Sequence, residues 1–292
     1  MWFTIFSSLV FIAIFQDLLQ PYTVLLAKVL QSQCLSLSPS TKWSDSYNAI
    51  VCGVNLPEGQ FKEILKLSGL LHLIVVSGSH LVFLEQLVLR LSKKSWFIMP
   101  LLVAFVLMTG FQPPAVRSFV SMLVQKFSDA HRLLWPKHIV VFISGVLTWL
   151  LVPSWISSYS FLLSWGAAFA LTLVPETKKF CKQIGIYLVL YPLFLPLSPL
   201  NPISIIYNLI LGPVIGAILF PLSLLAFLIP KFFLVSDLMW QALNFVLLLT
   251  SSYVPKFYGP SIIEMIFLWT YLWLVQMLFH FYRIHRERSD AQ

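Results

Sequence analysis

The sequence predicts an all-α protein: a polytopic integral membrane helical bundle of about nine or ten spans, in which some helices are broken. Three observations predict this fold class. Hydrophobic residues make up 59% of the chain and charged residues only 10%, against roughly a quarter in soluble domains. The apolar residues come in blocks of about 20, the helix length that crosses the hydrocarbon core of a bilayer. Proline and glycine interrupt several of these blocks.

The first apolar block, 2–19, is rich in aromatic residues but lacks a basic flank and a small-residue cleavage site. We therefore expect a retained helix and not a cleaved signal. Further spans are predicted at 68–91, 96–111, 114–128, 138–152, 160–175, 183–198, 204–229, 234–254 and 261–281. The chain thus divides into a first span with a short extracytoplasmic loop (1–66), a transmembrane domain (67–282) and a basic cytoplasmic tail (283–292).

Basic residues fall mostly in the segments that follow even-numbered spans. Because lysine and arginine collect in cytoplasmic loops, this pattern predicts that both termini are cytoplasmic. The same rule accounts for a net charge of +8, so charge alone does not assign a nucleic-acid partner.

The polar stretch 20–67 then lies outside the membrane, and it contains Cys34 and Cys52. An oxidising compartment would allow a disulfide between them, and two free, partly buried cysteines are the alternative. Cys181 falls in a predicted cytoplasmic loop, where we expect an unpaired thiol. The cysteines lack the spacing of a metal site, so no metal is expected.

The segment 68–81 places two histidines, His72 and His80, in one apolar span together with Ser77 and Gly78. Ionisable groups inside a membrane are costly and are candidates for function. On a continuous helix His72 and Ser79 would lie about 20° apart. A break at Ser77-Gly78 would instead aim a half-helix N-terminus at an anion. A packing notch of small residues with a hydrogen-bonded histidine is the non-functional alternative.

The segment 109–119 predicts a helix that starts at about Pro114, because proline suits the first helical position. Arg117 then lies in the first turn, where it either snorkels to the outer interface or faces a polar cavity. Its planar guanidinium suits bidentate pairing with phosphate oxygens. In the eighth span, Gly212-Pro213 with Gly216 predicts a helix break, which survives at membrane depth only beside protein or water.

Four segments carry a resemblance to a known family. The run 49–91 contains the pattern G-[LT]-x-H-L-[LI]-x-V-S-G-x-H, and 109–117 fits T-G-F-x-P-[PS]-A-V-R. The segments 160–165 and 208–213 are similar to G-F-Q-L-S-F and N-L-L-x-x-P. In this order they resemble the competence domain of the ComEC DNA-internalisation family, over about 49–255. Ser79 replaces a usual leucine, Leu162 a usual glutamine, and Val152 a common acidic residue.

The resemblance implies that 67–282 is a competence-type transmembrane channel domain, which takes up single-stranded DNA through the bacterial inner membrane during natural transformation. The expected pathway residues are His72, Ser77, Gly78, His80, Arg117, Asn208 and Pro213. Arg117 and His72 would form the outer mouth, and Ser77 to His80 the midplane constriction. Asn208 and the Gly212-Pro213 break would form a facing wall.

Full-length members of that family also carry an OB-like domain and a metallo-β-lactamase-like domain. The outer loop here is too short for a complete OB barrel, and no H-x-H-x-D-H motif occurs. H-E-x-x-H, Walker and rhomboid-type G-x-S-G motifs are also absent, so we expect no catalysis and no cofactor.

The expected partners are single-stranded DNA, membrane lipids, a periplasmic DNA receptor, a cytoplasmic motor or helicase and a separate nuclease. Two alternatives stay open. A transporter for a small anionic solute or lipid precursor would use the same broken spans as an occluded site. A membrane scaffold for a separate nuclease or helicase would instead depend on its cytoplasmic loops.

Overall fold

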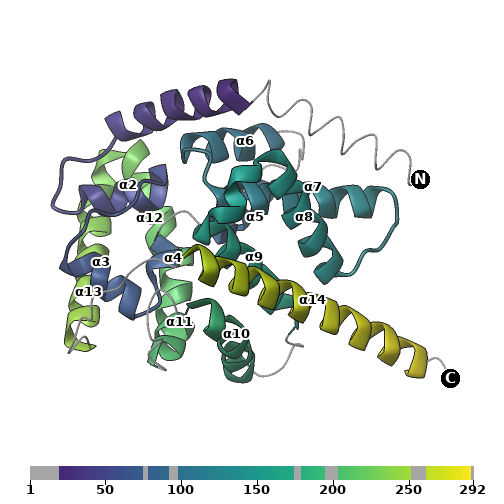
Figure 1. The fold of residues 1–292 in the computed structure, drawn as a ribbon. Helices are drawn as coiled ribbons and strands as arrows, with labels where there is room; N and C mark the ends of the chain where they lie inside the picture. Colours follow the sequence, from purple (N-terminus) through teal and green to yellow (C-terminus); the bar gives the residue numbers. More distant parts are fainter. Residues whose placement is uncertain are drawn as a thin grey trace.

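The protein is described by a computed structural model, which covers residues 20–74, 78–91, 98–173, 179–194, 203–250 and 261–290. These residues form helices and connecting segments and contain no strand, which confirms the all-α class (Figure 1). The predicted first span, 2–19, lies outside the described residues, and so does Ser77.

Each of the other predicted spans coincides with one or two helices. They are α4 (Leu71–Ile74), α5 (Gly78–Leu91), α6 (Ile98–Met108), α7 (Pro113–Ala130), α8 (Lys137–Leu151), α9 (Tyr159–Leu173), α10 (Lys179–Phe194), α11 (Ile203–Val214), α12 (Phe220–Leu228), α13 (Phe233–Thr250) and α14 (Ile262–Asp290). Two short 3₁₀ turns, Pro153–Ser157 and Pro230–Phe232, follow α8 and α12. Cys181 lies in the first turn of α10 and not in a loop, because that helix begins four residues before the predicted span.

Four stretches are long and apolar enough to cross a membrane: 71–90, Ile206–Leu228, Pro230–Leu249 and Ile262–His285. The first of them runs over 75–77, which are not described. Four shorter apolar helices cover Ile98–Met108, Lys137–Leu151, Tyr159–Leu173 and Ile184–Leu193. At 1.5 Å per residue, the shorter helices do not span a core of about 30 Å by themselves. They complete a helical membrane bundle by packing against the long ones.

The break predicted in the eighth span is a local π-helical turn within one continuous helix, Ile206–Leu228. After Pro213 the chain forms a π-helical turn, η3 (Ile215–Leu219), before α12 continues in the same direction. A proline ring removes one backbone hydrogen bond and crowds the carbonyl four residues earlier, and single π turns are common at functional sites.

Helix α7 is the polar centre of the bundle. It packs against α5, α6, α8 and α9. Its buried residues include Arg117, Ser118 and Ser128 among apolar neighbours. Two prolines occupy its first positions, Pro113 and Pro114, as the sequence predicted to within one residue. A helix that is surrounded on several sides can direct polar side chains at the protein interior and away from lipid.

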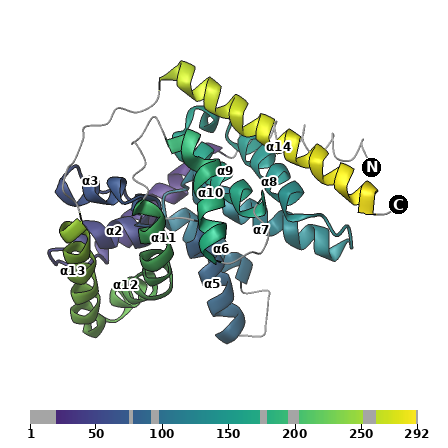
Figure 2. The ribbon, with the colours of Figure 1, turned by 90° about the horizontal axis from the view of Figure 1, so that it is seen from below.

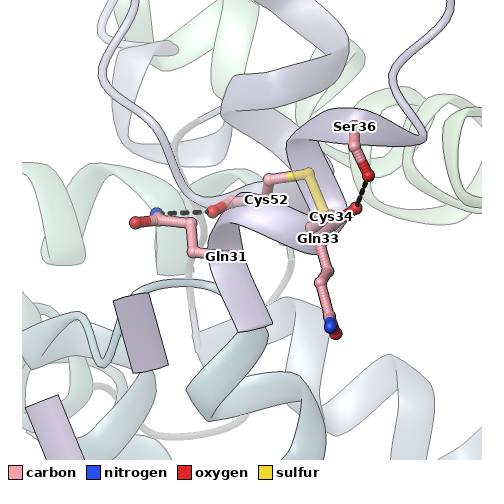
Figure 3. Close-up of a disulfide and its surroundings, with 5 residues drawn as sticks. All are labelled: Gln31, Gln33, Cys34, Ser36 and Cys52. Atoms are coloured by element: carbon pink, nitrogen blue, oxygen red, sulfur yellow. Dashed lines mark hydrogen bonds between the residues drawn. A yellow bond between two sulfur atoms is a disulfide. The ribbon is translucent and has the colours of Figure 1, made fainter. Parts of the chain in front are cut away.

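The stretch 20–67, called the outer stretch after its predicted location, is helical where the sequence indicated only a polar segment. It contains a helix that covers 20–36 and ends at Ser36, followed by α2 (Ser44–Cys52) and α3 (Gln60–Leu67). Cys34 and Cys52 form a disulfide with a Cα–Cα distance of 5.8 Å (Figure 3). The amide of Gln31 donates to the carbonyl of Cys52 at 2.9 Å. The helix over 20–36 therefore docks on α2, across the top of Figure 1.

The outer helices also hold the loop that precedes α7. Gly53 ends α2 with φ +72°, and its α-carbon faces the backbone of Thr109. The amide of Gln112 donates to the carbonyl of Gly53 at 3.3 Å. Gly110, with φ +76°, approaches the side chain of Gln31. A side chain at either glycine would be strained and would collide with the residue opposite. The loop before α7 therefore packs closely against the helix over 20–36 and the end of α2.

The far side of the bundle is formed by α9, α10 and α14. Trp165 of α9 is fully buried against Gly145 of α8. The indole of Trp269 on α14 donates to the carbonyl of Ile156 at 2.6 Å. Helix α14 runs along one edge of the molecule, away from α12 and α13 (Figure 2).

Candidate functional site

The guanidinium of Arg117 is the centre of the candidate site. Arg117 lies near the start of α7, and only 6% of its surface is exposed. Its Nε donates to Oγ of Ser164 on α9 at 2.8 Å, and its Nη2 donates to Oγ of Ser118 at 3.2 Å. Two hydroxyls thus orient the guanidinium between α7 and α9. The snorkelling anchor is excluded, because the side chain points into the bundle.

Arg117 has no acidic partner among the described residues. The ion pairs in that part of the chain join Lys62, Lys66 and Lys126 to glutamates. Removing a charge from water costs several kcal/mol unless it is paired or hydrogen-bonded, and two neutral hydroxyls satisfy only part of a guanidinium with five N–H donors. A buried, oriented cation without a carboxylate is suited to bind an anion that comes from outside the fold.

Gly78 lies directly against this guanidinium. A methyl group built on Gly78 would overlap the Ser118 side chain and would lie 3.8 Å from Nη2 of Arg117. The two sequence motifs, Ser-Gly-x-His and Val-Arg, therefore meet in space at α5 and α7. Close approach requires glycine here, because any larger residue would overlap the side chain of Ser118.

We expect Gly78→Ala to destabilise the protein by about 1–3 kcal/mol, because the added methyl displaces Ser118 in a packed interior. Ser118→Gly in the same chain removes the overlapping atoms and should restore most of the loss. Thermal unfolding in detergent measures the effect. The control is Gly216→Ala in η3, where an added methyl meets nothing within 4 Å. Equal stability of Gly78→Ala and the wild type would contradict the close contact.

His80 is buried two residues further along α5. It is 1% exposed, and its ring stacks on Phe220 of α12 with centroids 4.2 Å apart. The ring also hydrogen-bonds to the backbone of Leu73. Phe220 is the first residue after the π turn, so the broken span supplies the surface on which His80 rests.

His72 and Asn208 form a second group, near the end of α3. Nδ2 of Asn208 on α11 donates to the carbonyl of Gly69 at 3.5 Å, and His72 hydrogen-bonds to the same backbone unit. Gly212 of α11 faces Leu73 at contact distance. Pro213 is exposed at the end of α11. Asn208 and Gly212 of α11 thus lie beside Gly69 and Leu73, and the pathway wall expected from Asn208 and Pro213 stays a prediction.

The outer mouth expected from Arg117 and His72 stays a prediction. Arg117 packs beside Gly78, and His72 hydrogen-bonds to the backbone of Gly69. Sequence reasoning missed Ser118 and Ser164 as partners of Arg117. The sequence offered one indication of these partners, namely their positions. Ser118 follows the arginine directly, and Ser164 lies within the segment 160–165. Leu162, which replaces a usual glutamine, is fully buried.

Among the residues that the structure describes, there is no group of three or more histidine, cysteine, aspartate or glutamate side chains that could hold a metal ion. The arrangement brings together an oriented cation, two hydroxyls and a stacked histidine.

Comparison with known proteins shows the family to which the chain is similar. The model of a family described as "Competence protein" matches residues 55–284. An uncharacterized protein of Mycoplasma genitalium is 30% identical over 53% of the chain and 44% of its own length. An uncharacterized protein of Aquifex aeolicus is 28% identical over 69% of the chain and 52% of its own length. The chain thus spans about half the length of these relatives. No solved structure matches.

Proposed function

The chain belongs to the Competence protein family, and on this premise we propose that it is the inner-membrane channel through which single-stranded DNA enters the cytoplasm during natural transformation. The observation that carries the proposal is Arg117, a buried guanidinium that the hydroxyls of Ser118 and Ser164 orient and that pairs with no carboxylate among the described residues. A phosphodiester backbone supplies one negative charge per nucleotide, with which such a cation can pair.

The neighbours of Arg117 support a narrow passage. Gly78 lets α5 approach α7 closely beside the cation, and His80 adds a flat, buried ring that stacks on Phe220. Flat side chains next to a basic group suit a single strand, because bases stack without regard to sequence. Asn208 and the break after Pro213 would line the opposite wall.

The proposed setting is the bacterial inner membrane, with both termini in the cytoplasm and the disulfide-bonded region outside. Such a channel needs a periplasmic DNA receptor, a cytoplasmic motor or helicase and a separate nuclease as partners. We propose no catalytic step for the chain itself, because its sequence carries no ATP-binding or metal-hydrolase motif.

The proposal is tested by a transformation assay that separates DNA bound outside the inner membrane from DNA delivered inside. In a strain that lacks the protein, we expect labelled DNA to accumulate outside, and the wild-type gene to restore delivery. Normal delivery in the deletion strain would contradict the proposal. Loss of uptake of a small anionic solute, with DNA delivery intact, would support a transporter instead.

A further inference from the structure

A second polar cluster lies where the start of α8 meets the end of α14. Nε2 of His138 is 3.4 Å from Nδ1 of His280, and Nη1 of Arg283 is 3.2 Å from Nδ1 of His138. His138 is 6% exposed, and its ring contacts Phe279 edge-on. None of these residues belongs to the Arg117 site.

The hydrogen bonds determine where the protons lie. Arginine only donates, so Nδ1 of His138 must accept. The proton of a neutral His138 is then on Nε2 and is donated to Nδ1 of His280. His280 therefore carries its own proton on Nε2, the nitrogen that points away from the pair. The cluster presents an N–H donor beside a permanent positive charge.

By length and composition, this cluster falls at the end of a stretch that can cross a membrane. His280 and Arg283 fall in the last turns of the apolar stretch Ile262–His285. His138 is the second residue of α8, after the exposed Lys137. Basic side chains between helices at this depth meet the headgroup layer, where anionic lipids bind to them.

An open apolar groove lies on α14, and its lining ends in sequence at Phe281, between His280 and Arg283. It has a volume of about 490 Å³, and Trp273, Leu274, Met277, Leu278 and Phe281 contribute to its lining. Leu274, Met277, Leu278 and Phe281 are each more than half exposed. A groove without charged residues that ends beside a basic cluster matches a molecule with an apolar chain and an anionic head.

We propose that His280 and Arg283, oriented by His138, bind the headgroup phosphate of an anionic phospholipid whose acyl chain lies in the groove of α14. A planar guanidinium and an imidazole N–H are suited to phosphate oxygens. The groove distinguishes this ligand from inorganic phosphate, which has no apolar part to fill it.

The test uses the full chain in a neutral detergent, with phosphatidylglycerol or phosphatidylcholine added. We measure lipid retention by native mass spectrometry and thermal unfolding with each lipid. The wild type should prefer phosphatidylglycerol, and His280→Gln with Arg283→Gln should reduce this preference about fivefold or more. The matched control is Lys231→Gln, which removes an exposed cation between α12 and α13 and should leave the preference unchanged.

Three results would overturn the proposal. The first is an unchanged preference for phosphatidylglycerol in the double variant. The second is a full stabilising effect from glycerol phosphate, which has the headgroup charge but no acyl chain. The third is that the double variant loses equal stability with both lipids. The cluster would then only hold α14 against α8. Arg283→Lys, which keeps the charge, should retain part of the preference.

Discussion

Replacement of Arg117 by methionine is expected to reduce DNA delivery to the cytoplasm about 10- to 100-fold while leaving the protein folded. A charge-assisted hydrogen bond contributes about 1.5–3 kcal/mol, which corresponds to that range of rates or affinities. Methionine keeps much of the side-chain volume and removes a buried charge that has no acidic partner among the described residues. Such a replacement is often neutral or stabilising.

Stability and function should therefore change in opposite directions at this position. Thermal unfolding in detergent reports stability, and the assay that separates outside from inside DNA reports function. Arg90→Met, in the exposed last turn of α5, is the matched control and should leave delivery unchanged. Arg117→Lys should be intermediate, because it keeps the charge but loses the contact from Nε to Ser164. A methionine variant that unfolds easily would assign Arg117 a structural role.

Removal of the disulfide is expected to lower the free energy of unfolding of the outer region by about 3 kcal/mol. Cys34 and Cys52 are 18 residues apart, and closing a loop of this size restricts the unfolded chain by about that amount. Both cysteines are at least 97% buried, so alanine is the suitable replacement since it introduces no buried hydroxyl. Unfolding of Cys34→Ala with Cys52→Ala is compared with the wild type, with and without a reductant.

The reductant should lower the stability of the wild type to that of the double variant and should leave the double variant unchanged. Cys181→Ala is the control and should not respond. We also expect reduced DNA delivery, because the disulfide-linked helix over 20–36 supports the loop before α7, one turn ahead of Arg117. Equal stability of the oxidised and reduced wild type would show that the bond does not support the outer region.

The sequence by itself determined the fold class and the approximate positions of the helices from α4 to α14. The need to satisfy backbone groups in lipid makes each long apolar block a helix. The start of α7 followed from Pro113 and Pro114, and Pro213 marks where the later helix takes a π turn instead of breaking. The outer stretch 20–67 was less predictable, because short helices held by a disulfide depend on packing more than on local preference.

Only the tertiary structure decided which polar residues meet. Arg117, Gly78 and Ser164 are distant in sequence and come together because α5, α7 and α9 pack side by side. Helix packing likewise brought His138 to His280 and Arg283. Side-chain partners depend on contacts between helices, and a hydropathy pattern carries no information about which helix faces which.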